Sequence, residues 1–81
     1  MNKEFVGNVM VGGVFEYNGG LFAVMPFDWN EMRYTNLCIA TRNHCDYDMG
    51  ETYFFREDLE VTPIDRAELK KFIPKKDYEM R

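Results

Sequence analysis

The residues best suited to chemistry lie in one short polar stretch, 42–51 (RNHCDYDMGE). It contains the single histidine, His44, beside Cys45, while the other cysteine, Cys38, lies seven positions upstream. Thiolate and imidazole are typical zinc ligands, but a structural site needs four ligands, commonly with cysteines two to four residues apart. Here six residues separate the cysteines, and neighbouring side chains of an extended segment point to opposite faces. We therefore expect no metal site, with Cys38, His44 and Cys45 as weak candidates.

The same stretch does not assemble a catalytic nucleophile. Nucleophilic catalysis needs an activated cysteine or serine held beside a base, and the sequence contains no serine. Cys45 adjoins His44 only in sequence, and the negative charge of Asp46 and Asp48 opposes formation of a thiolate. No glycine-rich segment has the spacing of a phosphate-binding loop. We therefore predict that the protein is not an enzyme and uses no cofactor.

The composition indicates one small folded domain. Of the 81 residues, 46% are hydrophobic and 16% aromatic, although a chain of this length buries only about 60–65% of its unfolded surface. The N-terminal apolar run is too short for a signal peptide, and no window reaches the roughly eighteen apolar residues that cross a bilayer. We expect a cytoplasmic protein with no membrane contact and reduced thiols. Free, bridged and zinc-bound cysteines all remain open.

Charge is distributed unevenly along the chain. Residues 1–64 carry four basic and ten acidic side chains, a net charge of −6, whereas residues 65–81 carry six basic and four acidic ones, a net charge of +2. Affinity for nucleic acid depends on Lys and Arg that neutralise phosphates, so the acidic body opposes direct nucleic-acid binding. It suits a basic protein surface, or it serves solubility alone.

The elements that position these residues begin with a β-hairpin at 14–24. Asn18-Gly19 lies between two alternating apolar runs, and Asn-Gly tolerates the positive φ angles of a type I′ turn. With these residues as the loop, Phe15 opposes Phe22. The register places four apolar residues on one face: Val11, Phe15, Phe22 and Val24. Gly12-Gly13 predicts a bulge or sharp bend at the start of the first strand.

Further strands are predicted at 35–42, at 51–57 and at the end of 56–64, because each is a short apolar or aromatic run bounded by turn residues. The hydrophobic period changes at Asp65, and Glu68, three residues later, has the spacing of a capping box. We therefore expect a mostly β fold, a small five-stranded barrel over 1–64. A short C-terminal α-helix and tail, residues 65–81, would pack on it within a single domain.

The order of these elements over about residues 7–64 resembles an SH3-like barrel: a hairpin, a long connection, two strands, a tight turn and a last strand. The acidic ALYDY-type segment of SH3 domains proper is absent. The resemblance therefore implies a fold and no ligand preference.

The long connection, 26–34 (PFDWNEMRY), is the best candidate for binding a partner. Aromatic residues and Met are enriched at the centres of protein interfaces, and loops commonly present contact residues. An acidic rim from the stretch 45–51 would complete the surface. The residues assigned to it are Phe27, Asp28, Trp29, Glu31, Met32, Tyr34, Asp46, Tyr47 and Asp48. The alternative is that Phe27 or Trp29 folds back as a lid on the barrel.

These features predict a protein-binding module whose acidic face docks on a basic partner surface. Small size, excess acid and the lack of a catalytic motif make the chain similar in composition to accessory or inhibitor proteins of phages and mobile elements. That resemblance implies an inhibitor of a nucleic-acid-handling host protein. Two alternatives remain open: a single-stranded nucleic-acid-binding barrel that stacks bases on aromatic rings, and a structural subunit in which Tyr53 or Phe54 seals a homo-oligomer.

Overall fold

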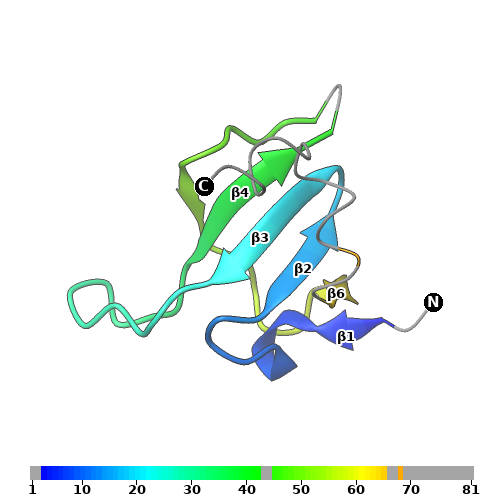
Figure 1. The fold of residues 1–81 in the computed structure, drawn as a ribbon. Helices are drawn as coiled ribbons and strands as arrows, with labels where there is room; N and C mark the ends of the chain where they lie inside the picture. Colours follow the sequence, from blue (N-terminus) through cyan, green and yellow to red (C-terminus); the bar gives the residue numbers. More distant parts are fainter. Residues whose placement is uncertain (1–2, 43–44, 66–67, 69–81) are drawn as a thin grey trace, which may run out of the picture.

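A computed structural model describes residues 3–42, 45–65 and 68 of the chain. Within them, six antiparallel strands form one sheet in the order β1-β6-β2-β3-β4-β5 (Figure 1). The elements are β1 (Glu4–Phe5), the 3-10 helix η1 (Val6–Asn8), β2 (Val14–Tyr17), β3 (Gly20–Val24), β4 (Asn36–Thr41), β5 (Thr52–Tyr53) and β6 (Glu60–Ile64). The prediction of a mostly β fold is confirmed. No helix among the described residues is long and apolar enough to cross a membrane.

The β2–β3 hairpin forms in the predicted register. Asn18 and Gly19 have φ angles of 48° and 86°, because a type I′ turn requires positive φ at both central positions. Phe15 opposes Phe22 across the two strands. Both side chains are fully buried, and their rings stack with centroids 5.5 Å apart.

A sharp bend at Gly12-Gly13 precedes β2, as the paired glycines predict. Gly12 has a φ of 87°, and the N–H of Gly13 donates to the carbonyl of Met10 at 2.7 Å. Val11 lies in this bend and is 52% exposed, so its expected place on the inner face is wrong. The alternation of side chains along a strand does not continue through a tight turn.

The sheet does not close, and the prediction of a five-stranded barrel is wrong in both strand number and closure. The edge strands β1 and β5 have two residues each and do not pair with one another. The predicted strand 51–57 is reduced to β5, and residues 54–59 cross the open side of the sheet instead. The N–H of Val6 donates to the carbonyl of Leu59 at 2.9 Å, which attaches this crossing segment to η1.

The hydrophobic core lies between the sheet and the crossing segment. Its buried members are Val6, Phe15, Phe22, Val24, Cys38 and Val61. Half-buried side chains pack against them, namely Val9, Tyr17, Tyr47, Tyr53, Phe55 and Leu59. Because Phe55 and Leu59 come from the crossing segment, side chains rather than a strand ladder cover the open side.

The predicted C-terminal helix lies outside the described residues, apart from the bonds at its expected start. The N–H of Glu68 donates to Oδ1 of Asp65 at 2.8 Å, and the N–H of Asp65 donates to Oε1 of Glu68 at 3.5 Å. These reciprocal bonds are those of a capping box. The helix itself stays a prediction.

Gly20 provides a test of the core packing. A Cβ at this position would lie 2.7 Å from the ring of Phe22 and 3.0 Å from the ring of Tyr47. Where no such contact exists, Gly→Ala stabilises a protein by about 0.4–1 kcal/mol, because it restricts the unfolded chain. We expect Gly20→Ala instead to lower the free energy of unfolding by about 1–3 kcal/mol, as overpacking does, in urea denaturation.

The matched control is Thr41→Ala, at the exposed partner of Gly20 in β4. It should change the free energy of unfolding by no more than about 0.5 kcal/mol. A Gly20→Ala variant as stable as the parent would contradict the packing described here.

Candidate protein-binding surface

The loop between β3 and β4 projects beyond the sheet (Figure 1) and is braced by Asp28. The N–H of Asp28 donates to the carbonyl of Arg33 at 2.9 Å, and the N–H of Arg33 donates back at 3.2 Å. Oδ1 of Asp28 also accepts the N–H groups of Asn30 and Glu31, at 2.9 and 3.1 Å. An Asp side chain that bonds to the following backbone in this way stabilises a turn. The main role of Asp28 is therefore to stabilise the loop. Its Oδ1 accepts both turn bonds, and Oδ2 accepts neither.

Three aromatic rings of the loop form one cluster around Phe27. The ring of Phe27 meets those of Trp29 and Tyr34 edge to face, at centroid distances of 4.7 and 5.0 Å. Trp29 is nevertheless 76% exposed, so it is not a lid on the barrel end. The neighbouring rings restrict the conformations of the Trp29 side chain, so the side chain loses little conformational entropy if another molecule contacts it. The cluster therefore presents an ordered apolar surface to solvent.

A groove of about 610 Å³ runs beside this loop. One wall is the loop itself, another is the segment from η1 to the glycine bend, and a third is the start of the crossing segment. Among the residues that the structure describes, eight large hydrophobic side chains are exposed, and five of them line this groove: Met10, Val11, Met32, Tyr34 and Phe54. The guanidinium of Arg33 lies 4.5 Å from the centroid of the Phe54 ring, and this cation–π contact joins two of the walls.

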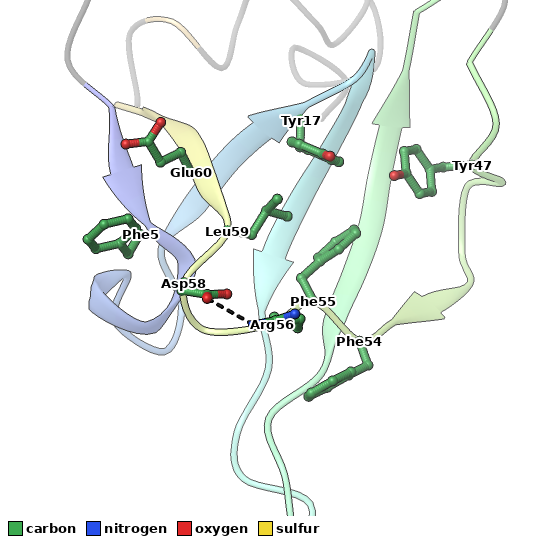
Figure 2. Close-up of a pocket in the computed structure, with 9 residues that line it drawn as sticks. All are labelled: Phe5, Tyr17, Tyr47, Phe54, Phe55, Arg56, Asp58, Leu59 and Glu60. Atoms are coloured by element: carbon green, nitrogen blue, oxygen red, sulfur yellow. Dashed lines mark hydrogen bonds and ion pairs between the residues drawn. The ribbon is translucent and has the colours of Figure 1, made fainter.

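The neighbouring residues Phe54 and Phe55 both line the groove and a second hollow on the open side of the sheet, but their rings point in different directions. Figure 2 shows the Phe55 ring turned toward Tyr17 and Tyr47, while Phe54 points the other way. Phe55 lies 5.7 Å from Tyr17 and 5.0 Å from Phe22, ring to ring. The hollow beside these tyrosines is also lined by charged side chains of both signs, namely Arg56, Asp58 and Glu60.

The acidic residues predicted to complete the surface lie elsewhere. Asp46 and Asp48 are exposed, but their segment packs near the β2–β3 turn, where a Cβ on Gly19 would lie 3.0 Å from Cβ of Cys45. The aromatic loop leaves the opposite end of β3 (Figure 1). The structure therefore brings Phe27, Trp29, Met32 and Tyr34 together and does not add Asp46 or Asp48 to them.

Tyr47 has a structural role in this segment. Its ring packs edge to face on Phe22 and Tyr53, each at a centroid distance of 5.0 Å. Burial is the main cause that raises the pKa of its hydroxyl, and the negative charge of Asp46 adds to it. Tyr47 is therefore half-buried in the core, with little of its ring available to a partner.

The two thiols are not joined in a disulfide. Cys38 and Cys45 are both free, and no group of three metal-ligating side chains occurs among the residues that the structure describes. His44, the third weak metal candidate, lies outside those residues. Cys38 is 1% exposed, and burial raises the pKa of its thiol, which keeps it neutral and poorly reactive.

Sequence reasoning located the aromatic loop but missed half of the groove. The sequence predicts Val11 on a strand face and Phe54 in the strand 51–57, stacking bases or sealing an oligomer, and it assigns no role to Met10. The usable signal was the run Met10-Val11 directly before the glycine pair, because apolar residues beside a bend have no strand face to enter. No local pattern indicates that the bend lies beside the loop.

No protein-family model, curated protein or solved structure matches this chain. The resemblance to phage accessory proteins therefore gains no support from a relative. What the surface binds has to be inferred from its own residues.

The buried thiol of Cys38 makes stability sensitive to alkaline pH. Because its folded pKa is raised, the folded state holds the proton more tightly than the unfolded state does. Stability is therefore unaffected below the unfolded pKa of about 8.5 and falls as the pH rises above it. We expect Cys38→Val, which cannot ionise, to lose less stability than the parent between pH 7 and pH 10 in urea denaturation. Parallel losses would show that Cys38 is not the responsible group.

Proposed function

We propose that this protein is a non-enzymatic binding module that holds a partner protein against its aromatic loop and groove. One observation supports this above the others: most of the large hydrophobic residues that are exposed in the described part of the chain line a single groove. Contiguous exposed apolar surface of this kind marks interaction sites on soluble proteins. Met10 and Met32 add flexible, polarisable side chains, which adapt to the shape of a bound surface.

The charge of the chain favours a basic partner. Residues 1–64 carry a net charge of −6. Beside the groove, Arg33 is paired with Glu31 at 3.8 Å, so Glu57 is left as the lining residue whose charge is not offset there. Complementary charge around an apolar centre speeds association and orients the partner.

A protein that handles nucleic acid is a partner of this kind, since its own surface is basic. Blocking such a surface would make the protein an inhibitor, the role that its composition implies for a phage or mobile-element product. Direct nucleic-acid binding is less well supported. Arg33 is the one basic residue among those lining the groove, and Glu31 and Phe54 already engage it.

The test begins with a partner captured from source cells and then purified. We expect Trp29→Ala to weaken its binding by about 2 kcal/mol or more, roughly 30-fold in Kd, because Trp29 is the most exposed aromatic ring of the cluster. Calorimetric titration would measure this. Affinity should also fall as salt is added, since exposed charges are screened.

The matched control is Met49→Ala. Met49 is also a large exposed apolar residue, at 64%, but it belongs neither to the aromatic loop nor to the groove. Its removal should change Kd less than about twofold. Equal losses for the two variants, or salt-dependent binding of single-stranded oligonucleotides in place of the protein, would reject the proposed function.

A further inference from the structure

The residues that line the groove include a buried polar side chain with one unpartnered atom. Three of the lining residues are buried: Val6, Val24 and Asn36. Asn36 opens β4 and lies between Val24 of β3 and Tyr53 of β5 in the sheet register. It is 2% exposed and is the one buried polar residue among those described. An apolar groove thus ends on a single amide.

One half of this amide is satisfied and the other is not. Nδ2 of Asn36 donates to the backbone carbonyl of Tyr53 at 3.2 Å. Oδ1 is the only buried side-chain oxygen or nitrogen without a hydrogen-bond partner in the described part of the chain. The carbonyl of Tyr53 can only accept, so it fixes which end of the amide faces it. The unpartnered atom is therefore an acceptor.

The surroundings of the acceptor define what it can receive. The walls carry aromatic rings, from Phe27, Tyr34 and Phe54, and methionines, which favour contact with rings. The volume of about 610 Å³ lies within the range of about 300–1,000 Å³ that holds small ligands. An aromatic group fits these walls, and a hydrogen-bond donor on that group would complete the amide.

We propose that the groove receives an aromatic side chain of a partner protein that carries one hydrogen-bond donor, such as an indole, and that Asn36 Oδ1 accepts this bond. The inference rests on the proposed function and names the chemistry that the partner supplies. Basic residues flank the aromatic side chain, because Glu57 lines the groove and the body of the protein is acidic.

A second copy of the chain also offers an indole, that of the exposed Trp29. The net charge of −4 opposes this pairing, since two copies would bring their acidic bodies together. A partner with basic flanks meets no such repulsion. We therefore assign the groove to a different protein.

The test uses the full chain, labelled with ¹⁵N, and acetylated heptapeptides with a central aromatic residue between glycines and paired lysines. The central residue is tryptophan, 1-methyltryptophan, which lacks the indole N–H, or 5-methyltryptophan, which has the same added bulk and keeps it. We expect the tryptophan and 5-methyltryptophan peptides to bind about tenfold more tightly than the 1-methyl peptide. Amide shifts should concentrate on groove residues such as Gly7 and Arg33.

Asn36→Leu supplies the matching change in the protein. It removes the acceptor while keeping an apolar side chain of similar size, and thermal melting would verify that it folds. In this variant the three peptides should bind within about twofold of one another. The comparison of peptides on the parent protein keeps the proposal testable if the variant does not fold.

The outcomes separate this inference from the proposed function. Equal binding of all peptides to the parent, or no shifts in the groove, would overturn the role of Asn36, whereas the proposed function would still stand if Trp29→Ala weakens the captured partner. A concentration-dependent dimer that Trp29→Ala abolishes would also overturn the inference, because the groove would then serve a second copy.

Discussion

The packing of Phe22 is the interaction on which the rest of this structure depends. Its ring meets four others, at centroid distances from 5.0 to 5.9 Å, namely those of Phe15, Tyr47, Tyr53 and Phe55. These rings come from β2, from the connection after β4, from β5 and from the crossing segment. In an open sheet with two-residue edge strands, the few backbone hydrogen bonds at the edges contribute little stability. Side-chain packing therefore has to hold these segments together. Packing around Phe22 thus connects segments that hydrogen bonds between strands would connect in a closed barrel.

The groove is a consequence of that packing. In an extended chain, successive side chains point to opposite sides, so a Phe55 that enters the core leaves Phe54 outside it. The cation–π contact between Phe54 and Arg33 then connects the crossing segment to the aromatic loop. The apolar surface of the groove and the burial of the core therefore depend on the same segment, and a substitution at Phe54 also affects the packing of its neighbour Phe55.

The parts of the fold that could be predicted are those set by neighbouring residues. Asn18-Gly19 determines its own turn and, with it, the register of the hairpin, and Asp65 and Glu68 make the capping bonds that their spacing indicates. The failed predictions depend on contacts between distant segments. The run 51–57 has the composition of a strand, but only β5 finds a partner strand, since the rest is drawn across the core by Phe55. Likewise, the aromatic loop can be recognised from its content of aromatic residues and Met. Nothing in the sequence distinguishes Asn36 from an ordinary strand residue.

Asn36 affects the stability of the fold and also lines the groove. Its Nδ2 bonds to β5 through Tyr53, while its Oδ1 remains a buried acceptor without a partner. An unsatisfied buried group costs about 1–3 kcal/mol, which is a large share of the roughly 5–15 kcal/mol that stabilise a typical domain. A leucine at this position would remove this penalty, but it would also take the Nδ2 donor away from the carbonyl of Tyr53, so the two effects oppose each other. A bound group that supplies the missing donor would remove the penalty of the unsatisfied Oδ1. The free energy recovered in this way would then contribute to binding.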